Sequence, residues 1–119
     1  MIIVKGSIPV KADRREEAVA LVQLLAETSR RESGCLSYEV YIQADAPEVI
    51  VIWQQWDSVD ALEDHFASDH VDHFLDAIPD LIEGEVTSAQ FAVQEESWSE
   101  IEEPIELPRV QYADNIVLH

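Results

Sequence analysis

The arrangement that most constrains the fold is a pair of strand patterns set between two helical stretches. Residues 36–42 alternate between apolar and polar side chains, as in a strand with one buried face. Residues 49–53 are continuously apolar, which is typical of a strand covered on both sides. The turn-forming segment at residues 44–47 is short, so the two strands are expected to form an antiparallel hairpin.

The stretch before this hairpin repeats apolar residues at helical spacing over residues 18–25. Asp13 and Glu16 have the spacing of a capping box at the start of a helix. Gly34 is the natural residue for a left-handed stop at the end of that helix. The sequence therefore predicts a helix that begins after Asp13 and ends before Gly34.

The stretch after the hairpin contains two serines suited to capping helices, Ser58 and Ser68, each followed by an aspartate in the first turn. Pro79 should end or kink the second of these helices, because proline cannot continue the helical hydrogen bonds. The buried stripe of that helix is predicted to consist of Val71, Phe74, Leu75 and Ile78.

Residues 2–10 and 85–94 alternate like strands and complete a βαββαβ order. Helices on one face of an antiparallel sheet give a ferredoxin-like α+β fold. The other sheet face has no helices of its own and carries apolar or weakly polar residues. We therefore expect a homodimer in which two copies bury this face.

The chain is expected to divide into a folded domain at residues 1–95 and a C-terminal extension at residues 96–119. Pro104 and Pro108 exclude a long helix from the extension. The extension combines glutamates with large apolar side chains, which favours an arm packed on the partner subunit. An arm folded on its own subunit is the alternative.

Charge narrows the range of partners. The formal net charge of the 119 residues is −18, and six of the seven basic residues precede residue 32. Such a surface repels nucleic acid and anionic membranes, and it suits either a halophilic source or an ordinary acidic protein.

The chain has no secretory cleavage pattern and no apolar run of membrane-spanning length, so a cytoplasmic location is expected. Cys35, the single cysteine, is expected to be a small buried residue.

Four segments carry a resemblance to a known family: residues 29–38 (SRRESGCLSY), 52–58 (IWQQWDS), 61–65 (ALEDH) and 68–70 (SDH). In this order and spacing they resemble the antibiotic biosynthesis monooxygenase-like superfamily of dimeric α+β barrels. The resemblance covers residues 2–94 and leaves the C-terminal extension outside. It implies a homodimer with a pocket between each sheet and its own helices.

Members of this superfamily include cofactor-free oxygenases of quinols and polycyclic phenols, haem-degrading enzymes and isomerases of a small sugar-derived signal. Where the superfamily often has a glutamate, this chain has Gln54, which cannot take up a proton as a carboxylate does. The asparagine, tryptophan and histidine of the haem-degrading branch align with Lys5, His65 and Leu75. Haem degradation is therefore not expected.

A cofactor-free oxygenase needs a base that titrates near neutrality, a dry cavity and hydrogen-bond donors. His65 is the expected base, and His70 would assist or orient it. The substrate would be a small aromatic molecule whose anion reacts directly with molecular oxygen, without a cofactor. The residues predicted to bind it are Trp53, Trp56, Phe66, Phe74, Tyr38, Tyr41 and Gln54.

Two other functions remain open beside a monooxygenase of a quinol or phenol. An isomerase of a small carbonyl compound would use His65 and His70 to move a proton between neighbouring carbons. A non-catalytic dimeric module for ligand binding or stress response is favoured by Gln54, and His65 would then be structural. A metal site formed by His65, His70 and His73 is not expected, because the spacing matches no common zinc pattern.

Overall fold

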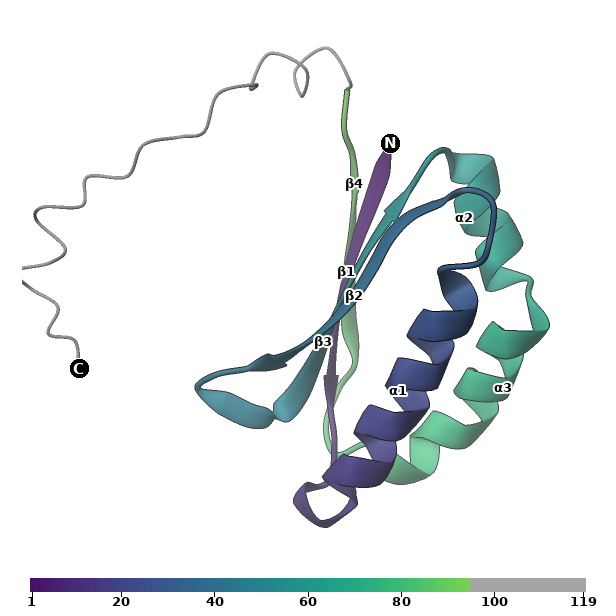
Figure 1. The fold of residues 1–119 in the computed structure, drawn as a ribbon. Coiled ribbons are helices and arrows are strands. Elements are labelled where there is room, and N and C mark those ends of the chain that lie inside the picture. Colours follow the sequence, from purple (N-terminus) through teal and green to yellow (C-terminus); the bar gives the residue numbers. More distant parts are fainter. Residues whose placement is uncertain (95–119) are drawn as a thin grey trace, which may run out of the picture.

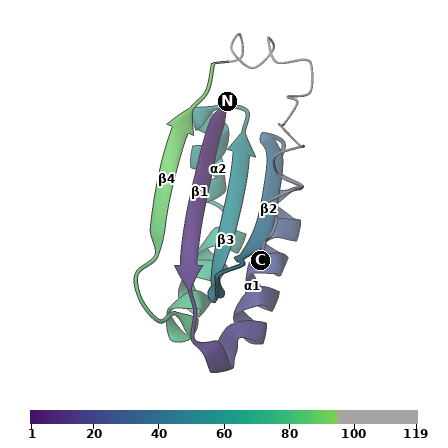
Figure 2. The ribbon, with the colours of Figure 1, turned by 90° about the vertical axis from the view of Figure 1, so that its left-hand side faces the viewer.

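The computed structural model describes residues 1–94 and consists of an antiparallel sheet with helices packed on one face (Figure 1). The strands are β1 (Ile2–Pro9), β2 (Cys35–Gln43), β3 (Ala46–Trp56) and β4 (Thr87–Ala92). They lie in the order β2-β3-β1-β4 (Figure 2). The helices are α1 (Arg15–Ser29), α2 (Val59–Phe66) and α3 (Asp69–Ala77), with short 3₁₀ segments η1 (Ala12–Arg14) and η2 (Ile78–Leu81). The predicted βαββαβ order and ferredoxin-like class are confirmed.

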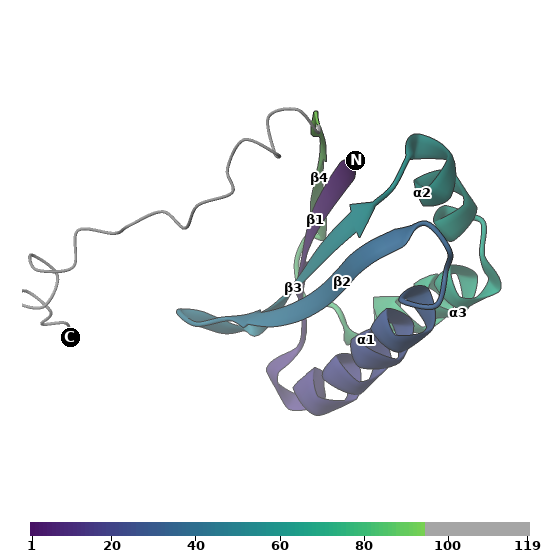
Figure 3. The same cartoon turned by 45° about the horizontal axis from the view of Figure 1, so that its top comes forward.

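The strand register decides which side chains meet the helices. Ile8 lies opposite Ile50 in the β1–β3 pair, and Tyr38 lies opposite Gln54 in the β2–β3 pair. Because side chains alternate along a strand, Trp56 shares the helix-facing side with Gln54. All three α-helices cover this side (Figure 3). The core between the two layers includes Val4, Ile8, Val10, Ala18, Val22, Leu25, Ile50, Ile52, Trp56, Leu62, Val71, Phe74 and Ile78.

Two predicted features at the ends of α1 are wrong. Asp13 lies inside η1, and α1 begins without a side-chain cap. Arg14 instead forms a two-pronged salt bridge with Glu17, with N–O distances of 2.9 and 3.0 Å. Gly34 does not adopt a left-handed backbone. It is glycine because a Cβ at this position would overlap the Cβ of Ala61, so the turn after α1 passes directly against α2.

Most of the predicted features of the second helical region are confirmed. The Ser58 hydroxyl accepts a hydrogen bond from the backbone N–H of Ala61 at 3.1 Å, as an N-cap should. Helix α3 ends at Ala77, and Pro79 lies in the 3₁₀ segment that follows it. The inclusion of Leu75 in the buried stripe is wrong, because that side chain is 55% exposed.

Within residues 1–94, no helix or strand covers the sheet face away from the helices (Figure 2). Tyr41 and Phe91 are more than half exposed there, and Trp53 lies between Lys5 and Glu39 of the neighbouring strands.

The predicted C-terminal extension lies outside the described residues. None of the helices within residues 1–94 has the length and apolar character needed to cross a bilayer.

Candidate functional site

His65 is the buried centre of the candidate site. It lies in the last turn of α2, whose start is capped by Ser58, and it is only 2% exposed. Its ring centroid lies 4.5 Å from that of Trp56 and 5.8 Å from that of Tyr38, both on the helix-facing side of the sheet. Burial lowers the pKa of His65 from its ordinary value, although the hydrogen bond and charge of Glu32 oppose this shift. Burial therefore disfavours the charged imidazolium form of His65.

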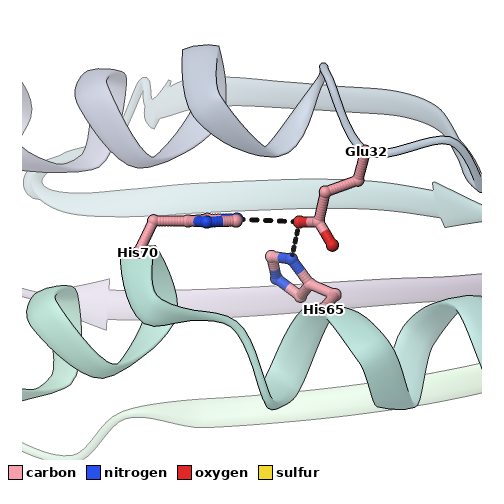
Figure 4. A group of neighbouring side chains, drawn as sticks. All are labelled: Glu32, His65 and His70. Carbon is pink, nitrogen blue, oxygen red and sulfur yellow. Dashed lines mark hydrogen bonds and ion pairs between the residues drawn. The ribbon is translucent and has the colours of Figure 1, made fainter.

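Glu32 joins His65 to a second histidine, His70 (Figure 4). It lies in the turn between α1 and β2, where its carbonyl oxygen accepts a hydrogen bond from the N–H of Cys35 at 3.0 Å. Its Oε2 atom lies 2.6 Å from Nδ1 of His65 and 2.8 Å from Nε2 of His70. A carboxylate oxygen accepts hydrogen bonds, so each imidazole donates an N–H to Oε2 of Glu32. The ring nitrogens left free are then Nε2 of His65 and Nδ1 of His70.

Ser68 connects the two helices that carry these histidines. It stands at the N-cap position of α3, but its hydroxyl makes no capping hydrogen bond. The hydroxyl instead donates to the carbonyl oxygen of His65 at 2.6 Å and lies 3.2 Å from Nε2 of His70. The end of α2 and the first turn of α3 are thereby held together, which fixes the two imidazoles relative to each other.

A groove of about 420 Å³ runs between α1 and α3 beside this cluster. His70 is 23% exposed and lines the groove, whereas His65 lies behind it. A mainly apolar wall with a few polar groups is typical of a site for a small organic molecule. The lining residues are Leu21, Leu24, Leu25, Thr28, Asp69, His70, His73 and Phe74.

Several of the predicted substrate-binding residues surround His65. Trp56 is fully buried, and its Nε1–H donates to Oε1 of the buried Gln54 at 2.8 Å. Burial raises the pKa of Tyr38 well above its ordinary value, so this phenol stays protonated at neutral pH. Phe66 lies 5.6 Å from His65, centroid to centroid, and is 47% exposed. Trp56, Gln54 and Tyr38 thus form a packed floor beneath the imidazole.

The remaining predicted residues lie elsewhere. Trp53 is three residues from Trp56, and Tyr41 is three from Tyr38, so strand alternation turns both toward the uncovered sheet face. The expectation that they share a pocket with His65 is therefore wrong. Phe74 lines the groove between α1 and α3, on the outer side of the histidine cluster.

Glu32 and the leucines of the groove are site residues that the sequence analysis did not identify. Glu32 lies within the segment 29–38 that carried the family resemblance, but it is 33 positions from His65. Leu24 is 55% exposed and belongs to no buried stripe. The packing of α1 beside α3 brings these residues together, and no pattern in the local sequence predicts that packing.

Comparisons with known proteins identify the family. The family model described as antibiotic biosynthesis monooxygenase matches residues 1–77. The uncharacterized protein Sll1783 of Synechocystis is 37% identical over 81 residues, which is 68% of this chain and 55% of Sll1783. Rv0793 of Mycobacterium tuberculosis is 31% identical over 72 residues, which is 60% of this chain and 70% of Rv0793. The chain thus matches little more than half the length of Sll1783.

Solved structures agree with this assignment. The structure of Rv0793 superposes with a TM-score of 0.74 at 26% identity and covers 78% of this chain and 94% of that chain. A protein from Deinococcus radiodurans superposes with a TM-score of 0.76 at 24% identity, covering 90% and 98%, and supports the fold alone. The family match covers residues 1–77, which include Glu32, His65 and His70. The chain therefore belongs to the antibiotic biosynthesis monooxygenase family.

Proposed function

We propose that this protein is a cofactor-independent monooxygenase that oxidises a quinol or phenol bound in the groove between α1 and α3. Membership of the antibiotic biosynthesis monooxygenase family supports the reaction class. The observation that carries the assignment of the site is the position of His70. Its ring lines an apolar groove while one of its nitrogens is held by Glu32, so a base and an apolar binding surface adjoin.

In this proposal His70 is the catalytic base and His65 is a positioning residue. The free Nδ1 of His70 accepts the phenolic proton, while Glu32 holds the ring and stabilises the imidazolium that forms. His65 is too buried to touch a substrate, but its N–H fixes the carboxylate of Glu32. The side chains of Leu21 and Phe74 provide apolar walls against which a flat ring can pack.

The reaction balances without a cofactor. Loss of a proton makes the quinol an electron-rich anion, which donates electrons to molecular oxygen and forms a carbon–oxygen bond as a hydroperoxide. Cleavage of the O–O bond leaves one oxygen atom on the ring and releases the other as water. A quinol and one O₂ thus give a hydroxyquinone and one water molecule. The four electrons that O₂ accepts all come from the substrate.

Replacing His70 by glutamine tests this assignment. The glutamine amide can still donate a hydrogen bond to Glu32, but it has no basic nitrogen. With a naphthoquinol as substrate, and no flavin or metal added, we expect kcat for oxygen uptake to fall by about 10²–10⁴-fold. Labelled ¹⁸O₂ should place one labelled atom in the quinone product of the unaltered protein.

His73→Gln is the matched control, because His73 lines the same groove on the same helix but is not bonded to Glu32. We expect this change to act mainly on KM, with a loss in kcat smaller than that of His70→Gln. Equal losses in kcat for the two variants would contradict the role of His70. Absence of oxygen uptake with quinols of one, two and three rings would contradict the proposed reaction class.

We further propose that a second copy of the chain covers the uncovered sheet face. This face carries the exposed rings of Tyr41 and Phe91, and Lys5 and Glu39 flank Trp53 with opposite charges. A two-fold axis near Trp53 would let the lysine of one copy meet the glutamate of the other. Light scattering should give twice the chain mass of 13.5 kDa, and a monomer at high protein concentration would contradict the proposal.

A further inference from the structure

We infer that Glu32, His65 and His70 together form a binding site for a divalent transition-metal ion such as Zn²⁺. One atom from each side chain, Oε2, Nδ1 and Nε2 respectively, lies within 4.8 Å of the other two. Two imidazole nitrogens and one carboxylate oxygen are a donor set that first-row transition metals prefer, whereas Mg²⁺ and Ca²⁺ prefer oxygen ligands alone. Three protein ligands also leave a fourth position open for water.

The two nitrogens lie within 4.8 Å of each other, and the carboxylate oxygen lies nearer to both than two ligands of a bound ion do. Ligands about 2.0–2.2 Å from a tetrahedral Zn²⁺ lie about 3.3 Å from one another. The carboxylate oxygen now lies 2.6 and 2.8 Å from the two nitrogens, so it must retreat by roughly half an ångström. Glu32 is on a turn and is 19% exposed, which leaves its side chain free to make this small movement.

A second hollow gives a cation a route to Glu32. This hollow, of about 270 Å³, opens beside the turn that carries Glu32, and no lysine or arginine is among its lining residues. Aspartates from α2 and from the turn before it line this hollow, in a chain with a net charge of −18. Clefts lined by charges of one sign concentrate ions of the other sign. The acidic residues of this hollow are Glu32, Asp57, Asp60 and Asp64.

Metal binding would switch off the proposed base, a consequence that rests on the proposed function. When Nε2 of His70 donates its N–H to Glu32, the lone pair of Nδ1 is free to take a proton. An ion on Nε2 needs the lone pair of that atom, so the proton of the neutral ring moves to Nδ1. His70 then has no free nitrogen facing a substrate, and oxygen uptake should fall as the ion binds.

The test is a titration of the untagged full chain, freed of metal by a chelator, with Co²⁺ as a visible probe. We expect the absorption of Co²⁺ to change on binding nitrogen ligands and to saturate at one equivalent. Zn²⁺ should displace it, and excess Mg²⁺ should not. Glu32→Gln and His70→Gln should each weaken binding by at least about tenfold. His73→Gln and His119→Gln should each retain the affinity of the unaltered chain.

The titration needs neither a quinol nor oxygen, so its result does not depend on whether the proposed reaction is correct. Circular dichroism shows whether each variant is folded. Because Glu32→Gln and His70→Gln change different residues, misfolding of one variant leaves the other as a test of the site. A Co²⁺ spectrum that remains that of the free ion at one equivalent would overturn the inference. It would also be overturned if His73→Gln or His119→Gln weakened binding as much as His70→Gln, because the ion would then lie elsewhere.

Discussion

Replacing Gly34 by alanine is expected to lower the free energy of unfolding by about 1–3 kcal/mol, the usual cost of overpacking. A methyl group at this position would overlap the Cβ of Ala61, so either the turn or α2 must move. Glu32 is on that turn and His65 is on α2, so the same movement separates the carboxylate from the imidazole. Urea unfolding followed by circular dichroism measures the effect.

A second substitution isolates the cause. Ala61→Gly removes the overlapping atom and should by itself cost about 1 kcal/mol, because glycine is a poor helix former. In the double variant Gly34→Ala with Ala61→Gly, we expect a loss at least about 1 kcal/mol smaller than the sum of the single losses. Gly6→Ala is the matched control, since its Cβ would meet only Thr87 O at an ordinary 3.8 Å. Additive losses in the double variant would show that the overlap is not the cause.

Truncating Trp56 to alanine is expected to cost about 3–5 kcal/mol, the largest stability loss that we expect from a single side chain here. Trp56 is fully buried, packs against His65 and donates its indole N–H to Gln54. Its removal leaves a cavity beneath the imidazole and an unpaired amide oxygen in the core. Urea unfolding of the variant at constant protein concentration measures this loss.

Trp53→Ala is the natural comparison, because it deletes the same side chain from the opposite face of the same strand. In dilute solution its effect on unfolding should be smaller than that of Trp56→Ala, because Trp53 is only partly buried in a single chain. At high concentration its main effect should be weaker self-association, seen by light scattering. Equal stability losses in dilute solution would contradict the different environments described for the two tryptophans.

The sequence predicted the elements well because their signals are local. Strand alternation, the Ser58 cap and the stop before Pro79 each depend on neighbouring residues, and each is confirmed. The errors arose where one local signal allowed two structures. Gly34 suits a left-handed stop, yet here the glycine makes room for Ala61. Leu75 adjoins a buried stripe but lies outside the face that packs.

The site was predicted less completely because its members are far apart in the sequence. His65 and His70 were identified as candidates from their chemistry alone. Neither could be matched to Glu32, which reaches them from a turn more than 30 residues away. Trp53 and Trp56 were both predicted to bind the substrate, although strand alternation turns them to opposite faces of the sheet.

The sequence by itself determined the order of strands and helices and the ferredoxin-like class, and it identified His65 and His70 as candidate site residues. Hydrophobic periodicity, helix caps and residue type each depend only on residues that are close together in the sequence. Only the tertiary structure decided which carboxylate meets the histidines and which of them lines a groove. Those features depend on how α1, α2 and α3 pack on the sheet, because packing brings residues together by shape and burial rather than by their distance along the chain.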